Sequence, residues 1–476
     1  MECEGNRSKR LMTKCKSISS PWQSLKYYIL YTLTLIILFI FLRPYSSPFD
    51  LLLTLTSTST PPANARQDDG PVTFLPLKDI RYAETAMDGN TWFMSSLNDT
   101  FEEGEAEHLH FPSKASQGRL LCLKGRDARN GSRNSYALAR SDALPEGSKL
   151  LPGLTFVSDT YYDYENLWHG LTAIVPFVGW SMKNRCVKPK RWILYHQGEI
   201  RSGMGSWVRQ VVEANYGEEV QMESFEGEGA GGEDDTYCLE EAVVMRHNLG
   251  KMGEEKKLKV SDQVRCKARE RCGVHGGGKD NTSTAEVNET GKPLIRMTLL
   301  MRRGSRSFKN ASAVVNVFAG ECKRFSGCLL KVVQSEELSF CDQVRVMTET
   351  DIVVSPHGAQ LTNMVFMERG SSVMELFPRG WLELAGVGQY AHHWMAKMAG
   401  MNHRGAWWEP LADGKKECPD PKDDARCFTY YKNGKVGHNE IHFASWARDV
   451  LNQVRTAKLT EVPSENPNPN PSRCPC

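Results

Sequence analysis

The sequence lacks an excess of either charge, an internal repeat and the motifs of several common protein classes. Lys and Arg number 59 against 57 Asp and Glu, so the chain has no basic excess of the kind that nucleic-acid-binding proteins carry. Before the tail Cys474–Cys476 no cysteine pair has the spacing of a zinc site, and no nucleophile elbow or metalloprotease motif occurs. We therefore expect a globular protein without a nucleic-acid partner, structural zinc or the usual hydrolase machinery.

One long apolar segment, Leu25–Leu42, lies near the N-terminus. As a helix it would span roughly 27 Å, close to the hydrocarbon thickness of a bilayer. We predict an uncleaved transmembrane anchor, because a cleaved signal peptide, the alternative, has a shorter apolar region that ends at small residues. The residues before it are rich in Lys and Arg, so the N-terminus is predicted to be cytosolic and the body lumenal.

Cysteines and glycosylation sequons support this topology. Twelve of the 14 cysteines follow the anchor, an even number that permits complete pairing in an oxidising lumen. We expect short disulfide loops at Cys266–Cys272, Cys322–Cys328 and Cys418–Cys427. The sequons also follow the anchor. They begin at Asn98, Asn130, Asn281, Asn288 and Asn310.

The length of 476 residues is too great for one ordinary hydrophobic core, so we predict two lobes with accessory segments. A stretch rich in Ser, Thr and Pro follows the anchor and predicts a flexible stem. The predicted order is a cytosolic tail (1–24), the anchor (25–42), a stem (43–85), a first lobe (86–285), a second lobe (286–400), a C-terminal helical segment (401–456) and a disordered tail (457–476).

Buried strand patterns alternate with helical patterns along the body. In the first lobe we predict strands at 191–196 and 242–245 and a helix over 203–214. In the second lobe we predict strands at 298–303, 329–333, 351–355 and 372–377, with helices over 310–318, 336–348 and 359–367. This alternation predicts an α/β fold with a doubly wound parallel sheet, whose ligands bind outside the carboxyl ends of the strands.

Residues suited to binding a diphosphate follow two of these strands. Ser355–Asn363 predicts a strand end, a tight turn and the start of a helix, where Gly358 lets a ligand approach the backbone and His357 can donate to an anion. The alternative is an ordinary strand-to-helix turn. The candidate binding residues from this segment are His357, Gly358, Ala359, Thr362 and Asn363.

Three arginines and one glutamate strengthen the interpretation as a nucleotide site. Arg302, Arg303 and Arg306 end the first strand of the same lobe and can make bidentate phosphate contacts. Glu375 lies in an apolar strand and needs a partner, for which the hydroxyls of a ribose are suitable and an ion pair with an arginine is the alternative. No Asp-x-Asp pair occurs, so we expect neither a metal ion nor any other cofactor.

Several segments closely resemble glycosyltransferase family 61. Residues 351–378 resemble its HGA-LTN turn and V-E-x-x-P strand, 299–310 its arginine-rich strand end, and 161–177 its N-x-x-H segment. The resemblance spans about 157–450, and its C-terminal part is similar to land-plant members. It implies a GT-B fold of two Rossmann-like lobes, an inverting mechanism and a UDP-sugar donor, commonly UDP-xylose in the plant branch.

The resemblance also implies a catalytic base in the first lobe. His169 matches the N-x-x-H histidine and is the first candidate, with Asp163 and Glu165 as alternatives. Members often carry an acidic residue four positions after this histidine, where this chain has Ala173.

The expected protein is thus a Golgi-membrane, single-pass type II glycosyltransferase, since an anchor, a stem and a lumenal body form the architecture of resident Golgi transferases. The acceptor stays open among xylan, an N-glycan core and O-linked transfer to a protein, and a homodimer is also open. The alternative from another class is a non-catalytic carbohydrate-binding protein that kept the fold.

Overall fold

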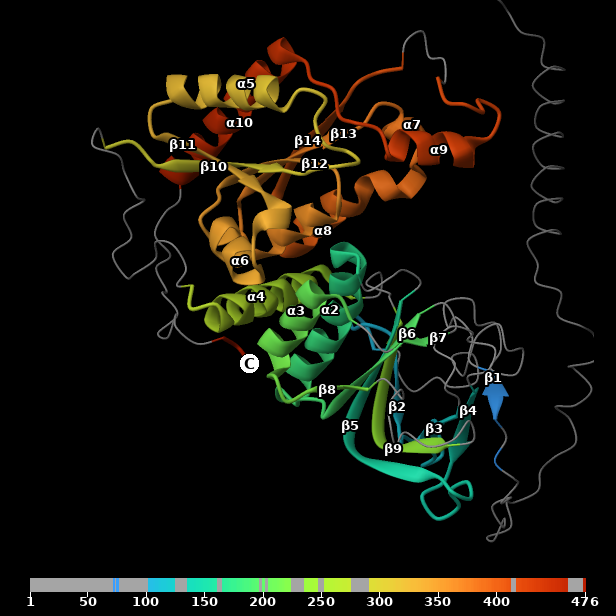
Figure 1. Ribbon diagram of the computed structural model, residues 1–476. Coiled ribbons are helices and arrows are strands. Elements are labelled where there is room, and N and C mark those ends of the chain that lie inside the picture. The colour runs from blue at the N-terminus through green and yellow to red at the C-terminus, as the bar shows by residue number, and fades with distance from the viewer. Residues whose placement is uncertain are drawn as a thin grey trace, which may run out of the picture. The chain divides into compact units, whose positions relative to one another are not determined.

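The computed structural model describes the chain in separate stretches (Figure 1). These are residues 72, 74–76, 102–124, 135–160, 165–196, 199–201, 204–223, 235–246, 252–274, 291–411, 417–460 and 474–476. All of them belong to one unit, Gly70–Cys476. The predicted anchor, Asp163 and the sequons at Asn98, Asn130, Asn281 and Asn288 lie outside the described residues. Within those stretches no helix is long and apolar enough to cross a membrane.

A nine-stranded sheet forms the first lobe. Its strands are β1 (Leu75–Pro76), β2 (His108–Phe111), β3 (Leu120–Lys124), β4 (Ser135–Ala139), β5 (Lys149–Thr160), β6 (Arg191–His196), β7 (Glu199–Arg201), β8 (Gln221–Glu223) and β9 (Thr236–Arg246). The order is β1-β4-β3-β9-β5-β6-β7, with β2 also beside β9 and β8 also beside β6. Leu75 and Pro76, which the sequence placed in the stem, pair with β4.

The prediction of a doubly wound parallel sheet is wrong for half of this lobe. Strands β9, β5, β6 and β8 are parallel, but β1, β2, β3, β4 and β7 pair antiparallel. The physical reason is visible between β3 and β4, because a connection of about ten residues is too short for a parallel crossover. The lobe is therefore a mixed α/β layer rather than a second Rossmann-like sheet.

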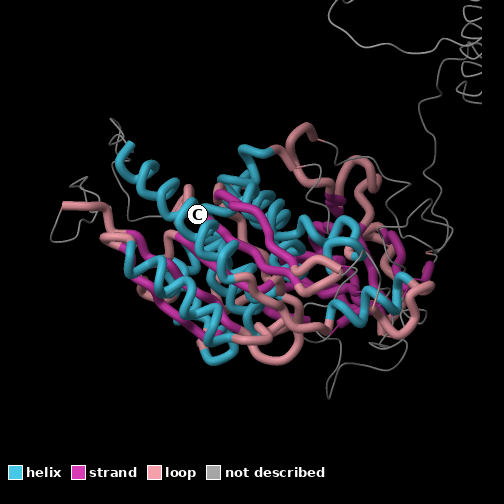
Figure 2. The backbone as a smooth tube through the Cα atoms, turned by 90° about the horizontal axis from the view of Figure 1, so that it is seen from above, coloured by secondary structure: helices cyan, strands magenta, loops and turns pink. Residues whose placement is uncertain are grey.

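The second lobe confirms the parallel α/β prediction. Its five parallel strands are β10 (Ile295–Met301), β11 (Cys328–Gln334), β12 (Ile352–Pro356), β13 (Ser372–Phe377) and β14 (Asn402–Trp408), in the order β11-β10-β12-β13-β14. Because β14 belongs to this sheet, the lobe extends beyond the predicted end at residue 400. Strands flanked by helices are also visible from above (Figure 2).

Helices cover both faces of this second sheet (Figure 1). One face carries α5 (Ala311–Arg324) and α10 (Glu440–Thr460), and the other carries α6 (Phe340–Thr348), η5 (Ala359–Phe366) and α8 (Ala391–Ala399). The predicted helix over 336–348 is divided into η4 (Ser335–Glu337) and α6, because Ser339 caps α6. The remaining short helices are α7 (Trp381–Leu384), η6 (Gly386–Tyr390) and α9 (Asp424–Lys432).

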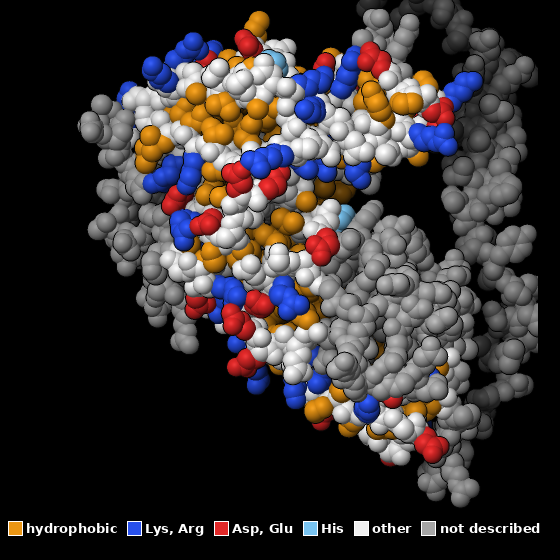
Figure 3. Space-filling model, viewed as in Figure 1, with side chains coloured by type: hydrophobic (Ala, Val, Ile, Leu, Met, Phe, Trp, Pro, Cys, Tyr) orange, Lys and Arg blue, Asp and Glu red, His pale blue; other side chains and the backbone are white. Residues whose placement is uncertain are grey.

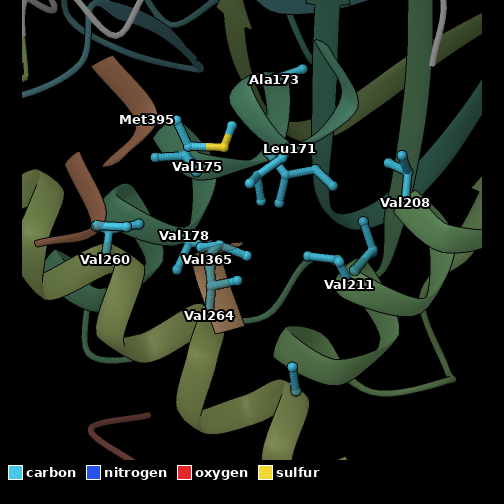
Figure 4. Packing of buried hydrophobic residues seen from close by; sticks show 14 of the residues in the cluster. Leu171, Ala173, Val175, Val178, Val208, Val211, Val260, Val264, Val365 and Met395 are labelled. Atoms are coloured by element: carbon cyan, nitrogen blue, oxygen red, sulfur yellow. The ribbon is translucent and has the colours of Figure 1, made fainter. Parts of the chain in front are cut away.

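Three helices of the first part of the chain pack directly against the second lobe. Helices α2 (Leu167–Lys183), α3 (Ser206–Tyr216) and α4 (Glu254–Arg271) share one hydrophobic core with η5 and α8. In Figure 4, valines of all three helices surround Val365 of η5, and Met395 of α8 lies against the same core. Trp207 adds a buried hydrogen bond of 2.9 Å from Nε1 to Oδ1 of Asn363. This shared core fixes α2 relative to the turn before η5.

All twelve cysteines after residue 42 form disulfides. The pairs are Cys122–Cys238, Cys186–Cys476, Cys266–Cys474, Cys272–Cys341, Cys322–Cys328 and Cys418–Cys427. Two of the three predicted loops are confirmed, and Cys266–Cys272 is wrong. Cys266 and Cys272 are six positions apart at the end of α4, so their side chains point roughly 120° apart around the helix axis. Each therefore pairs with a different cysteine, Cys474 and Cys341 respectively. The last three residues, predicted to be disordered, are thus held by two disulfides.

The visible surface carries basic and acidic side chains intermixed (Figure 3), in line with the formal net charge of +2. Among the sequons, Asn310 is described and exposed, and its side chain caps α5 by accepting a hydrogen bond from the N–H of Ala313 at 3.0 Å.

Candidate functional site

The candidate site lies where the strand order of the second sheet reverses. After β10 the chain places β11 on one side of it, and it then returns to place β12 on the other side of β10. Such a switch point separates the connections that follow two neighbouring strands and leaves a crevice at their carboxyl ends. Arg302 follows β10 directly and His357 follows β12 directly, so both residues lie at this crevice.

Two arginines, Arg302 and Arg306, bring positive charge to this position. Both guanidinium groups are partly buried, and the Nε atom of each is buried without a hydrogen-bond partner. Among the described residues neither arginine forms an ion pair, and Arg302 donates from Nη1 to Oε1 of Gln360 at 3.1 Å. Burial lowers the pKa of Arg302, and burial together with the charge of Arg302 lowers the pKa of Arg306 to about 10. Unpartnered cationic donors of this kind form a site for an anion.

The backbone at this crevice has the conformation that close approach requires. A Cβ atom at Gly358 would overlap Nη1 of Arg302 and lie 2.6 Å from Oε1 of Gln360, so only glycine leaves room for the guanidinium. Arg306 has a left-handed φ of 61°, which is unusual for a residue with a side chain and recurs at functional sites. Its guanidinium lies 5.4 Å from the ring centre of Trp381.

Glu375 contacts three histidines and is fully buried. Its Oε1 lies 2.6 Å from Nδ1 of His357 and 2.6 Å from Nδ1 of His392, and its Oε2 lies 3.0 Å from Nε2 of His403. A carboxylate can only accept these hydrogen bonds, so each imidazole donates an N–H. Among the described residues Glu375 has these three histidine partners and no arginine partner. The ribose contact that the sequence suggested stays a prediction. We assign it the role of orienting His357.

The protonation of this cluster follows from burial and charge. Burial by itself raises the pKa of Glu375, but the electrostatic interactions and hydrogen bonds with His392 and His357 outweigh it and hold the pKa well below its usual value. Burial, with smaller contributions from His392 and Arg306, lowers the pKa of His357 to about 4 against the opposing effect of Glu375. With the crevice empty at neutral pH, the pair is therefore an ionised carboxylate and a neutral imidazole.

Among the described residues, one group could supply metal ligands: His357, Glu375 and His392, whose ligand atoms lie within 4.8 Å of one another. Two ligands of a tetrahedral zinc ion with bonds of about 2.0–2.1 Å would be roughly 3.3 Å apart. The observed separation of 2.6 Å between each Nδ1 and the carboxylate oxygen is that of a short hydrogen bond. The geometry therefore fits a hydrogen-bonded network rather than a metal centre.

The other residues predicted for this site lie in three different environments. The side chain of Arg303 is 72% exposed and pairs with Glu337, so it is less suited to a partly buried anion site than Arg302 and Arg306. Thr362 and Asn363 are buried, and Asn363 bonds to Trp207. Ala359 is half-buried at the start of η5, and the helix predicted over 359–367 is a 3-10 helix.

The candidate base, His169, lies in the first turn of α2 and is half-buried. Helix α2 contacts η5, and Gly170 packs so closely on Val208 that a Cβ atom there would overlap the valine. Ala173, at the position where members of the family often carry an acid, is buried in the shared core (Figure 4). Glu165 is exposed just before the helix.

Residues 156–374 match the family Glycosyltransferase 61. This segment is thus similar to the glycosyltransferase 61 family. It contains Arg302 and His357 of the second lobe and His169 of α2. The family resemblance noted from the sequence is thereby confirmed. The turn at His357 and Gly358 and the segment around His169 both lie within the matched residues.

Curated proteins with similar segments are also transferases. The human protein O-linked-mannose β-1,4-N-acetylglucosaminyltransferase 2 is 33% identical over 99 residues, which is 20% of this chain and 16% of that protein. The EGF domain-specific O-linked N-acetylglucosamine transferase of the dog, Canis lupus familiaris, is 35% identical over 109 residues, which is 21% of this chain and 20% of that protein. The chain therefore matches a fifth or less of the length of these relatives.

A solved structure, the rubredoxin oxygen:oxidoreductase of Desulfovibrio gigas, covers 47% of this chain and 45% of its own chain at 12% identity and a TM-score of 0.22. Agreement at that level supports no conclusion about the fold.

Two residues that contact Glu375 were missed from the sequence, His392 on α8 and His403 on β14. No spacing motif connects them to Glu375. The available signal was the buried carboxylate itself, which indicates that polar partners exist without saying which residues they are.

Proposed function

We propose that this chain is a glycosyltransferase that transfers a sugar from a UDP-sugar to a glycan or glycoprotein acceptor. The observation that carries the proposal is the pair Arg302 and Arg306, two partly buried cations with unpartnered Nε atoms at the switch point of a parallel sheet. A diphosphate supplies the acceptor oxygens and the negative charge that these groups lack. The family 61 domain gives the reaction class.

The mechanism is a single in-line displacement at the anomeric carbon. The acceptor hydroxyl attacks this carbon while a base of the first lobe, His169, removes its proton. Negative charge develops on the departing diphosphate, where Arg302, Arg306 and His357 stabilise it. No metal ion is required in this scheme, because the arginines neutralise the leaving group.

Two donor sugars follow from two different arguments. The resemblance to plant members favours UDP-xylose, with xylan or an N-glycan core as acceptor. The names of the relatives favour UDP-N-acetylglucosamine and O-linked transfer to a protein. A screen of both donors against glycan-array and folded-protein acceptors separates the two.

The proposed location is the Golgi lumen, with one N-terminal helix in the membrane. Six disulfides support an oxidising compartment. The support for the anchor is the length and flanking charge of 25–42.

Calorimetric titration of the lumenal body, residues 70–476, with UDP tests the anion site. Arg302→Ala and Arg306→Ala should each weaken UDP binding by about 1.5 to 3 kcal/mol, the cost of a lost charge-assisted hydrogen bond. Arg303→Ala is the matched control, because this neighbouring arginine is exposed and paired with Glu337. Equal UDP affinity in all three variants and the wild type would refute the site.

A carbohydrate-binding protein without activity is the second candidate, favoured by the buried Ala173 at the position of the family's acidic residue. Slow hydrolysis of the UDP-sugar by the purified body supports the enzyme. Donor binding with neither hydrolysis nor transfer supports the binding protein.

A further inference from the structure

The cluster around Glu375 carries a consequence for how the proposed donor binds. Glu375 is 0% exposed and lies on β13, whose six residues are all buried. A carboxylate in such a place is costly unless hydrogen bonds and charge compensate it. Its described partners are three imidazoles, from the turn after β12, from α8 and from β14. Side chains from three separate elements thus stabilise the carboxylate of Glu375 next to Nδ1 of His357.

The ring of His357 has a fixed orientation. Its Nδ1 donates to Glu375, and its ring stacks on Phe377 and contacts the tilted ring of Trp381, with ring centroids 4.6 Å away in each case. Trp381 in turn contacts the guanidinium of Arg306. The Nε2 atom lies on the opposite side of the ring from Nδ1 and therefore points away from Glu375. Among the described residues, no hydrogen bond occupies it.

With Nδ1 donating to Glu375, a neutral imidazole has a lone pair at Nε2. The charged and titratable groups around this ring are Glu375, His392, Arg302 and Arg306, with His403 behind the carboxylate. A phosphate oxygen beside Nε2 is repelled by the lone pair but accepts a hydrogen bond from Nε2–H. The imidazolium that results would be stabilised by Glu375 on one side and by the phosphate on the other.

We infer that a nucleoside diphosphate binds with the uptake of one proton at Nε2 of His357, and that His392 and His403 are positioning residues that hold Glu375 against Nδ1 of this histidine. The inference rests on the proposed function, because it names the protonation change of that same site. A phosphate offsets the charge of Arg306, which is one of the causes that lower the pKa of His357 in the empty crevice. Binding therefore raises the pKa.

The direction of the pH dependence follows from this rise. Since the pKa of His357 is higher with ligand than without, the proton's contribution to affinity is complete below the free value of about 4. It is lost as the pH rises through the pKa of the complex. UDP affinity should fall by up to tenfold per pH unit between these two values.

Proton uptake is measured by titrating UDP into the body, residues 70–476, in Tris and in HEPES buffer at several values from pH 6.5 to 8. Because the buffers release protons with different enthalpies, the difference in binding enthalpy gives the number of protons taken up. We expect uptake that approaches one proton toward the acid end of this range. The nucleotide's own protonation is common to every variant and cancels between them.

Variants separate proton linkage from simple structural support. His357→Gln keeps a neutral N–H donor near the position of Nε2, so it should bind UDP without the excess uptake and with little pH dependence. Glu375→Gln should also abolish the uptake and weaken UDP binding about tenfold or more. His392→Asn and His403→Gln keep donors to the carboxylate and should retain the uptake. His442→Gln, an exposed histidine of α10, is the control and should match the wild type.

The outcomes are distinct. Uptake that persists in His357→Gln, in which the carboxylate keeps two of its donors, would overturn the inference even if Glu375→Gln does not fold. UDP binding without proton uptake in the wild type would overturn the inference and leave the proposed function standing. Absence of UDP binding would overturn both.

Discussion

Substitution of Gly358 by alanine tests the crevice through a single methyl group. The φ of Gly358 is 162°, an extended conformation open to any residue, so the change causes no backbone strain. The added Cβ would overlap Nη1 of Arg302 and lie 2.6 Å from Oε1 of Gln360. Ordinary contact begins at about 3.4 Å, so Gln360 must retreat by about 0.8 Å and the guanidinium by more.

Both displaced atoms are ends of flexible side chains, so stability should change little while the anion site is distorted. Loss of one charge-assisted hydrogen bond is worth about 1.5 to 3 kcal/mol, which corresponds to a ten- to hundredfold loss of UDP affinity. Calorimetry with UDP measures the affinity, and thermal melting measures the stability. Gly320→Ala on α5 is the matched control, because no atom lies within 4 Å of its Cβ position and alanine favours the helix.

A double-mutant cycle makes the test specific. If Gly358→Ala acts by moving Arg302, then it should add little to the loss already caused by Arg302→Ala. Additive losses would show that the methyl group acts elsewhere. Wild-type UDP affinity in Gly358→Ala would contradict the assignment of Arg302 as a diphosphate ligand.

Three further predictions concern the base, the metal and the topology. His169→Ala should lower turnover by about a hundredfold or more while UDP affinity stays unchanged; full turnover there, with none in Asp163→Asn, would move the base to Asp163. Transfer with a chelator present should remain within a few-fold of the rate with manganese, since arginines replace the cation; a rate that is abolished and restored by metal would show a missed carboxylate site. Protease added to sealed vesicles should spare the body and leave its N-glycans removable by glycosidase, whereas digestion of the body would reverse the topology.

The first four strands of the second lobe could be predicted because their signals are local, whereas β14 fell in the segment predicted to be helical. Strands such as Ile352–Pro356 and Ser372–Phe377 are short apolar runs between turn residues, and both faces of a parallel sheet are buried. The order of a strand, a Pro-His-Gly turn and a helix also follows from neighbouring residues. The sequence by itself therefore determined the first four strands of this sheet and the place of His357 directly after β12.

The features that the sequence left undetermined depend on where side chains point and on packing between residues far apart in the chain. Arg302 and Arg303 are adjacent, and only the path of the chain after β10 directs one toward Gln360 and the other toward Glu337. The partners of Glu375 lie 17 and 28 residues further along the chain, on a helix and a strand that packing brings to the same carboxylate. Cys266 meets the last residues of the chain for the same reason. Burial makes a polar partner obligatory, but only the tertiary structure decides which residue supplies it.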